Sequence, residues 1–289
     1  MLNALIGQKV AIVSHKPQTT RTSIQGVLTT DNAQVVFVDT PGIHKSTSLI
    51  NKRMMDVVRS ALEDRDVLLF LDDCTRPFAD EDEHAVSVLR GITSPSFLLL
   101  NKIDQLGDRR LLLPRIEKYK ALHEFNEYLP VSALTGEGIE ELKAAIITQL
   151  PEGPPFFPED YVTDQPERFL AGEMIREKIL DLTRQEIPHA VAVLIDTWED
   201  TPKITRISAT IYVERPGQKA IIIGAKGAML KKVGTAARLQ IETLLGRKVF
   251  LGLFVKVQPN WRENPEFLNA IDWRSMTGAE TAPESEVEE

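Results

Sequence analysis

The sequence predicts an α/β domain built on a doubly wound parallel sheet, followed by a smaller α+β domain. Short apolar runs alternate with helix-like segments from residue 8 to residue 150, which is the pattern of strands joined by crossover helices. A stretch rich in proline and glycine, residues 151–155, then interrupts the pattern. The chain of 289 residues is long enough to bury two separate cores.

Composition narrows the class of protein. The chain is 43% apolar and 26% charged, which is ordinary for a globular protein, and no apolar run is long enough to span a membrane. The N-terminus shows no signal peptide pattern. Cys74 is the single cysteine, so we expect no internal disulfide, and with five scattered histidines we expect no zinc site. The net charge of −8 argues against a general nucleic-acid binder but allows a local basic patch.

The first strand signal is the apolar run 35–38, which ends in Asp39-Thr40-Pro41-Gly42. An unbroken run of this kind is typical of a strand buried on both faces of a parallel sheet. Asp39 then lies at the C-terminal end of the strand, where open α/β sheets bind ligands. A carboxylate there can hold Mg²⁺ through water, and the Gly42 N–H can approach a terminal phosphate. The alternative is an ordinary strand that ends in a turn.

The second signal is Phe97–Leu100, which ends in Asn101-Lys102-Ile103-Asp104. The Asp104 carboxylate can accept hydrogen bonds from the N1–H and the 2-amino group of guanine, a donor pair that adenine lacks. Asn101 can hold the loop and the base edge, and the Lys102 stem can lie over the base. A third run, 128–131, ends in Ser132-Ala133-Leu134, whose backbone N–H groups can meet the guanine oxygen.

The remaining elements of the first domain follow from apolar spacing and from the positions of charged residues. We expect helices at 54–62, 80–90, 111–125 and 138–150, a strand at 67–72, and a polar loop at 44–51. Gly7 is expected to end a short N-terminal helix.

The second domain is predicted to contain a helix at 168–185, strands at 191–198 and 207–213, a glycine-containing loop, a helix with an apolar face, and a strand at 249–257. The loop is Gly224-Ala225-Lys226-Gly227, a pattern that can clamp the backbone of single-stranded RNA, with Lys226 adding charge. Ile221, Ile222 and Ile223 are expected to line the groove for the bases. The alternative is a plain helix N-terminus. Residues 215–248 carry eight basic residues against one acidic residue, an excess of seven; the basic ones include Lys231 and Lys232.

Together these motifs resemble those of translation-factor-like GTPases, with their DxxG, NKxD and SA[KL] sequences. The later GxxG motif narrows the resemblance to the Era family, which joins a Ras-like P-loop GTPase sheet to an α+β type II KH domain. The similarity runs from Leu2 to about Trp273. It implies a GTPase domain at 1–150, a linker at 151–167 and a KH domain at 168–262. Residues 278–289 are acidic, and we expect a disordered tail there.

The resemblance also implies ligands and roles. GTP or GDP would bind at 39–43, 101–104 and 132–134, with Mg²⁺ held by Thr20 and, through water, by Asp39. The segment 17–21 would be switch I, where Thr20 is slightly favoured over Thr19. Ile43 stands where Ras-like proteins carry a glutamine that orients water, so slow intrinsic hydrolysis is expected.

The family resemblance implies a GTP-gated factor that binds the 3′ end of 16S rRNA and aids maturation of the small ribosomal subunit. It also implies a monomer in the cytoplasm, with peripheral association with the inner membrane. Two alternatives stay open: an RNA-binding protein with a nucleotide-deficient G domain, and another KH-bearing GTPase.

One family motif is missing, since the sequence contains no G-x-x-x-x-G-K-[ST] P-loop. The stretch 2–7 resembles the family sequence that follows the P-loop. We therefore expect a sheet without its first strand, with unpaired backbone groups on the neighbouring strands. An internal methionine taken as the start, or a truncated gene, would explain this; the first is the favoured explanation.

Overall fold

The computed structural model describes residues 1–16, 18–43, 48–183, 187 and 190–272. The chain divides into two compact units. The first comprises Met1–Ala11, Thr20–Ser46 and Met54–Asp164, and the second Ile12–Thr19, Thr47–Arg53 and Gln165–Glu289. Each unit has its own hydrophobic core. The predicted acidic tail and residues 44–47 of the predicted 44–51 loop lie outside the described residues.

The first unit contains the predicted parallel sheet, in the order β3 (Leu68–Asp73), β4 (Ser96–Asn101) and β5 (Glu127–Val131). Both pairings are parallel. The apolar run of the middle strand, β4, is fully buried, since each residue from Phe97 to Leu100 is 0% exposed. The register aligns Asp73 with Asn101, and Asn101 with Val131, so the three strands end level with one another. The residues that follow them therefore gather at one edge of the sheet.

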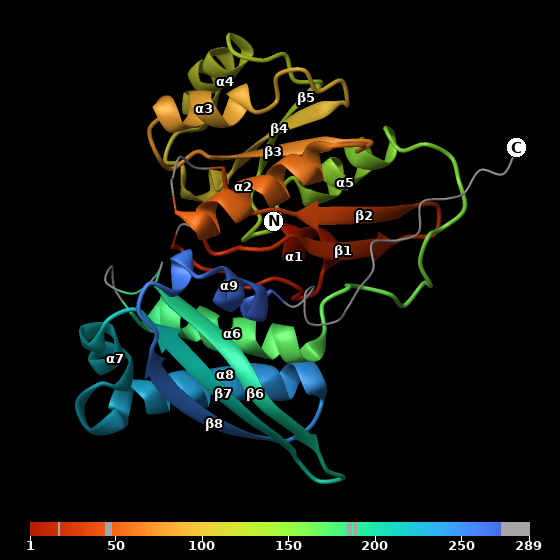
Figure 1. The fold of residues 1–289 in the computed structure, drawn as a ribbon. Coiled ribbons are helices and arrows are strands. Elements are labelled where there is room, and N and C mark those ends of the chain that lie inside the picture. Colours follow the sequence, from red (N-terminus) through yellow and green to blue (C-terminus); the bar gives the residue numbers. More distant parts are fainter. Residues whose placement is uncertain (17, 44–47, 184–186, 188–189, 273–289) are drawn as a thin grey trace, which may run out of the picture. The chain divides into compact units, whose positions relative to one another are not determined.

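Helices join and follow these strands (Figure 1). They are α3 (Asp80–Ser87), α4 (Leu112–Lys120) and α5 (Ile139–Ile147), each at a predicted position but shorter than predicted. Two short 3₁₀ turns precede α4: η1 (Ile103–Gln105) and η2 (Arg109–Leu111). Four acidic residues fill the first turn of α3, where they complement the helix dipole.

The strand that ends at Asp39 differs from the prediction. β2 (Gln34–Asp39) pairs antiparallel with β1 (Ile24–Thr29), and the two form a separate two-stranded sheet. Burial on both faces of a parallel sheet is therefore wrong for this strand: Val35 and Phe37 are buried, while their neighbours are partly exposed. The sequence pattern missed β1, because glycine and polar residues interrupt its apolar positions.

Two helices complete the first half of the chain. α1 (Leu2–Ile6) ends at Gly7, which adopts the predicted left-handed conformation with φ 78°. α2 (Leu49–Leu62) begins earlier than the predicted start at Met54. The predicted linker, 151–167, contains no helix before Glu167, and Thr163 forms an isolated bridge to Gly26 of β1.

A buried polar network ties α4 to the end of β3. The Arg115 guanidinium pairs with the Asp72 carboxylate, which is 1% exposed, and Tyr119 Oη donates to Asp72 Oδ1 at 2.7 Å. Arg115 also donates to the carbonyls of Asp73 and Arg76, at 3.1 and 2.7 Å. Burial and the Asp72 carboxylate raise the pKa of Tyr119. The carboxylate is thus fully compensated, which is the condition for keeping a charge in a protein interior.

The second unit orders its elements as helix, two strands, helix, GxxG turn, helix and strand. These are α6 (Glu167–Leu182), β6 (Val191–Asp200), β7 (Thr205–Val213), α7 (Pro216–Ile223), η3 (Ala225–Gly227), α8 (Ala228–Leu245) and β8 (Val249–Val257). The sheet order is β6-β7-β8, with β6 antiparallel and β8 parallel to β7. The short helix α7 was not predicted. A 3₁₀ turn, η4 (Trp261–Glu263), and α9 (Pro265–Ile271) follow β8.

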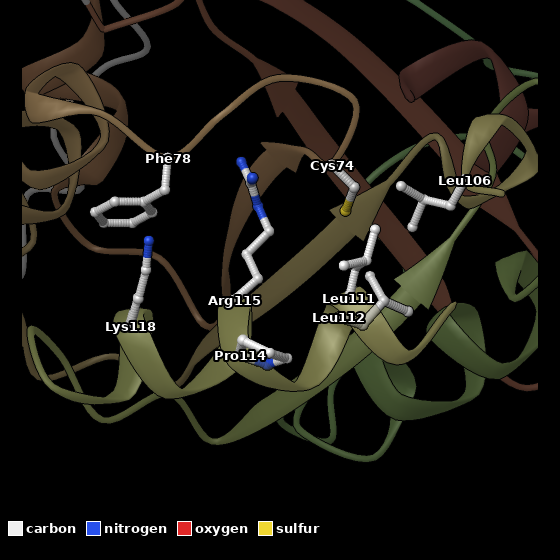
Figure 2. A pocket seen from close by; sticks show the side chains of 8 residues that line it. All are labelled: Cys74, Phe78, Leu106, Leu111, Leu112, Pro114, Arg115 and Lys118. Carbon is white, nitrogen blue, oxygen red and sulfur yellow. The ribbon is translucent and has the colours of Figure 1, made fainter. Parts of the chain in front are cut away.

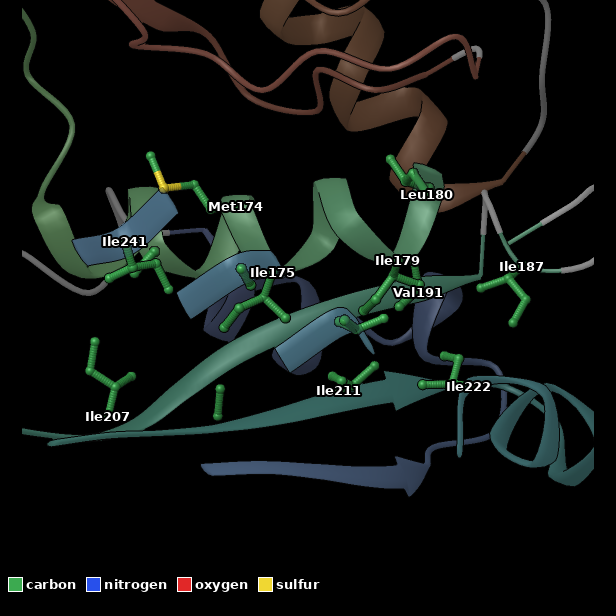
Figure 3. Close-up of a cluster of buried hydrophobic side chains, with 14 of the residues drawn as sticks. Met174, Ile175, Ile179, Leu180, Ile187, Val191, Ile207, Ile211, Ile222 and Ile241 are labelled. Carbon is green, nitrogen blue, oxygen red and sulfur yellow. The ribbon is translucent and has the colours of Figure 1, made fainter. Parts of the chain in front are cut away.

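The core of the second unit lies between one face of this sheet and the helices α6 and α8 (Figure 3). Ile175 and Ile179 of α6, Ile211 of β7 and Ile241 of α8 are each 0% exposed. Ile222 of α7 is also 0% exposed and belongs to this core. The prediction that Ile222 lines a groove is therefore wrong, whereas Ile221 is 39% exposed.

Among the residues that the structure describes, no helix combines the length and the apolar character needed to cross a bilayer.

We expect Arg115→Ala to destabilise the first unit by about 3 to 5 kcal/mol, because it leaves the buried Asp72 carboxylate without its partner. All three tryptophans belong to the second unit. Urea unfolding followed by tryptophan fluorescence should therefore be unchanged, while hydrogen exchange in the peptides of β3 and β4 should accelerate. Arg110→Ala is the control, since that side chain is 90% exposed. Unchanged exchange in Arg115→Ala would contradict a structural role for the network.

Candidate functional site

The residues after β4 and β5 lie together at the level edge of the parallel sheet. Asn101 Oδ1 accepts a hydrogen bond from the backbone N–H of Ala133 at 3.1 Å. Asp104 Oδ1 accepts one from Ser132 Oγ at 2.6 Å, and Ser132 Oγ accepts one from the Thr135 N–H at 3.1 Å. The two predicted motifs thus hold each other in place, and neither pairing was predicted from the sequence.

Asp104 is exposed, and among the described residues its hydrogen bond to Ser132 uses only Oδ1. Leu134, two residues after Ser132, is 80% exposed. Ile103 differs, since it is 3% exposed and packs in the core with α4. Ile103 therefore anchors the loop, while Asp104 stays available to a ligand.

Lys102 lies between these residues in a left-handed conformation with φ 69°. Its Nζ donates to Asp73 Oδ2 at 2.7 Å. Burial alone would raise the pKa of Asp73, but the hydrogen bonds from Lys102 and Thr75 outweigh it and hold that pKa below its usual value. The ion pair fixes the direction of the Lys102 stem along the edge of the sheet.

A second cluster follows β2, where Thr20 Oγ1 donates to Asp39 Oδ2 at 3.3 Å. Burial raises the pKa of Asp39 above its usual value. Thr19 differs from Thr20, because its hydroxyl donates to the Lys16 carbonyl at 2.7 Å. A hydroxyl and a carboxylate are oxygen ligands of the kind that Mg²⁺ prefers, so Thr20 and Asp39 fit a magnesium site better than Thr19 does.

The residues after Asp39 form an irregular segment in which Pro41 is buried, Thr40 and Ile43 are partly buried and Gly42 is exposed. No atom within 4 Å would meet a Cβ at Gly42. The backbone at Gly42 is therefore open to the approach of a ligand oxygen.

The GxxG turn of the second unit has a backbone that only glycine accommodates at its start. Gly224 adopts φ 71° and ψ 175°, and a Cβ there would lie 2.7 Å from the Met229 Cβ. Lys226 and Gly227 also adopt positive φ, at 51° and 78°. The turn thus brings main chain to the surface between α7 and α8.

Six of the eight basic residues of 215–248 fall into two groups. Toward β8, Arg238 and Lys248 pair with Glu242, and Arg247 pairs with Asp200. Near the turn, Lys226, Lys231 and Lys232 are exposed and form no ion pair with any described residue. The positive charge available to a ligand is therefore concentrated at the GxxG end of α8.

A pocket of about 210 Å³ lies in the first unit beside the Asp72–Arg115 network. Figure 2 shows Phe78 and Lys118 facing one another across one side of it, with Cys74 and leucines on the other. Burial, and next the Asp72 carboxylate, raise the pKa of the Cys74 thiol to about 12, so the thiol stays protonated at neutral pH. The residues lining the pocket are Cys74, Phe78, Leu106, Leu111, Leu112, Pro114, Arg115 and Lys118.

Comparison with protein families finds two matches on this chain. Residues 1–102 match the 50S ribosome-binding GTPase family, and residues 186–262 match the KH domain. The first match covers Asp39 and Asn101, and the second covers the GxxG turn.

Whole proteins and solved structures agree with these matches. The chain is 46% identical to GTPase Era of Geobacter metallireducens over 275 residues, covering 94% of this chain and 92% of that protein. It is 48% identical to GTPase Era of Leuconostoc citreum, covering 94% and 91%. The fold matches the crystal structure of Era in complex with MgGDPNP and nucleotides 1506–1542 of 16S ribosomal RNA, with TM-score 0.90, 40% identity, and coverage of 94% of this chain and 93% of that one. An Aquifex aeolicus Era variant bound to GDP·AlF₄⁻ matches with TM-score 0.88, 40% identity and the same coverage.

The pKa of Asp73 gives a test of the Lys102 geometry. Because the folded pKa lies below the usual value, the ion pair contributes stability above the usual pKa of aspartate, and that stability is lost as pH falls through the folded value. In Lys102→Met we expect the Asp73 carboxyl to titrate at a higher pH, measured by carbon NMR of the side chain. Lys143→Met, which removes a surface pair with Glu140, should leave the Asp73 titration unchanged. An unshifted Asp73 in Lys102→Met would contradict the assigned contact.

Proposed function

The chain belongs to the Era family of GTPases, and from this premise we propose that it binds GTP and GDP through its first unit and 16S rRNA through its second. Two hydrogen bonds support the nucleotide site best. They join Ala133 to Asn101 and Ser132 to Asp104, and so hold together the segments at the C-terminal ends of β4 and β5.

Guanine selection follows from the chemistry of this edge. Asp104 offers a carboxylate, which accepts hydrogen bonds and donates none, so it suits the N1–H and 2-amino group of guanine and not the edge of adenine. Because Ser132 fixes one oxygen of that carboxylate, little side-chain freedom remains to be lost when the base binds. The Lys102 stem, held by Asp73, would cover the base plane.

At the phosphate end, Thr20 and Asp39 would hold Mg²⁺, with Asp39 acting through water, and the Gly42 N–H would meet the terminal phosphate. Bound Mg²⁺ would neutralise charge on the phosphate oxygens. Thr40 and Pro41 position this segment after β2. Ile43 offers no hydrogen bond to an attacking water, which supports slow intrinsic hydrolysis.

The second unit would act as the RNA-binding part. The exposed main chain of residues 224–227 would clamp the RNA backbone, while Lys226, Lys231 and Lys232 neutralise phosphates. Ile221 and Ile223 remain the candidates for contact with bases, since Ile222 is buried.

At the level of the cell, we propose a monomeric cytoplasmic factor in maturation of the small ribosomal subunit, with peripheral association with the inner membrane. What supports this is the family membership alone. The second candidate, an RNA-binding protein deficient in nucleotide binding, is favoured by the absence of a P-loop motif in the printed sequence. Measuring GDP affinity by calorimetry separates the two: RNA binding without GDP binding would select the second candidate.

The nucleotide proposal predicts a change in base preference. Asp104→Asn should weaken GDP binding by about 10- to 100-fold, because an amide N–H replaces one acceptor of the 2-amino group. The same variant should bind xanthosine diphosphate better than the wild type does, since the xanthine 2-oxygen accepts from that amide. Asp56→Asn, on the exposed side of α2, is the control. Equal GDP affinity in wild type and Asp104→Asn would remove Asp104 from the base site.

The RNA proposal predicts a charge effect. Lys226→Glu should weaken binding of 16S rRNA nucleotides 1506–1542. The negative slope of log K against log salt should become less steep by about 0.7, the value for one lost phosphate contact on a single strand. Lys203→Glu places the same charge change in the β6–β7 turn and should have little effect. Fluorescence anisotropy over a salt series measures both. An equal loss in the two variants would indicate a general charge effect instead of a clamp.

A further inference from the structure

Two exposed phenylalanines on β8 have no role in the GxxG site. Phe250 is 55% exposed and Phe254 is 63% exposed. Their spacing of four residues on one strand places both rings on the same face of the sheet, about 13 Å apart along the strand. It is the face opposite α6 and α8, because the alternate residues of neighbouring β7, such as Ile207 and Ala209, are buried against those helices. Figure 3 shows the helices on the core side of the sheet.

The residues around the two rings form a strip with cations at both ends. The Arg206 guanidinium lies over the Phe250 ring, 5.8 Å from its centroid. Lys256, two residues after Phe254 and therefore on the same face of the strand, is exposed. Gly252 lies between the two rings and is paired with Ser208 of β7, so no bulky side chain separates them. We call the outward side chains of Arg206, Ser208, Phe250, Gly252, Phe254 and Lys256 the outer strip.

The strip has two boundaries. At one end, Phe267 of α9 packs edge-on against Tyr212 of β7, with ring centroids 4.9 Å apart, and covers the face there. Along one side, β6 carries acidic residues. Asp196 accepts a hydrogen bond from the Thr210 hydroxyl, and Glu199 lies opposite Arg206 in the register of β6 and β7. The aromatic and basic groups are therefore confined to β7 and β8, beside the edge of the sheet.

Exposed aromatic rings, neighbouring cations and small hydroxyl side chains on an open sheet are the combination that stacks unpaired bases and contacts the sugar–phosphate backbone. A protein partner would gain more area from a bulky apolar residue at position 252 than from glycine. The strip lies on a strand, β8, that packs against α7 and α8, the two helices that flank the GxxG turn.

We propose that the outer strip is a second RNA-binding surface, on which Phe250 and Phe254 each stack one unpaired base of RNA that flanks the segment held at residues 224–227. This inference rests on the proposed RNA binding of the second unit and adds a surface to it. A GxxG turn clamps about four nucleotides, so the strip would act only on longer RNA.

The test compares long and short RNA on the full chain. The long probe is 16S rRNA nucleotides 1506–1542, and the short probes are fragments of about four nucleotides tiled across it. In the double variant Phe250→Ala with Phe254→Ala, we expect affinity for the long probe to fall at least about tenfold in fluorescence anisotropy, with the best short fragment unaffected. Lys226→Glu should weaken both probes.

Matched variants separate stacking from apolar contact and from general surface change. Exchanging both residues for leucine keeps apolar area and should lose affinity as alanine does, whereas exchange for tyrosine should retain it. Phe156→Ala removes an 83% exposed ring of the first unit and should change nothing. Because Phe250 and Phe254 are exposed, the variants should melt at nearly the wild-type temperature.

Three outcomes would overturn the inference. Long-probe affinity within twofold of wild type in the double alanine variant, with Lys226→Glu impaired, would show that RNA binds only at the turn. Wild-type binding by the leucine variant would indicate an apolar protein-docking surface. Unimpaired binding in both Lys226→Glu and the double alanine variant would refute the proposed RNA site itself, and the strip with it.

Discussion

The candidate nucleotide site depends on the complete burial of the apolar run of β4, residues 97–100, between two parallel neighbouring strands. A strand with four consecutive residues at 0% exposure cannot shift its register without driving apolar side chains out of two cores at once. That constraint fixes the level of Asp73, Asn101 and Val131. The pairing of Asn101 with Ala133, and of Asp104 with Ser132, follows from that level, because each pair bridges the ends of two adjacent strands.

A buried carboxylate, that of Asp72, lies close to the same edge. Asp72 precedes Asp73 on β3 and points to the opposite side of the sheet, where it meets Arg115 and Tyr119 of α4. Asp72 therefore binds side chains of α4 on one face of the sheet, and Asp73 binds Lys102 on the other. Arg115 donates to the Asp73 carbonyl as well, so the position of α4 and the position of the Lys102 contact are mechanically linked.

Local patterns predicted the parts of this fold that rest on local chemistry. The apolar runs at 97–100 and 128–131 became β4 and β5, and the motif residues at their ends lie where the runs placed them. β1 was missed, because it pairs with one neighbour only and mixes polar with apolar residues, so its apolar residues show no strong two-residue periodicity. The stretch 221–223 suggested an exposed groove, yet it is the last turn of α7, a helix that Pro216 at its start could have revealed. The pairings between motifs depend on register, which no single segment of sequence contains.

In the second unit, the distribution of ion pairs carries more meaning than the count of charges. The eight basic residues of 215–248 suggested one continuous surface, but Glu242 and Asp200 engage the three nearest β8. Glu242 also accepts the Val249 N–H at 3.1 Å, and with that bond as the largest cause its pKa is lowered. The single acid of the segment thus fastens the turn between α8 and β8. Lys226, Lys231 and Lys232, which form no ion pair with any described residue, lie at the opposite end of α8, beside the turn in which the positive φ and close contacts of Gly224 exclude a Cβ. Charge and exposed main chain coincide there, and this coincidence, more than net charge, distinguishes an RNA-binding surface from a solvated helix.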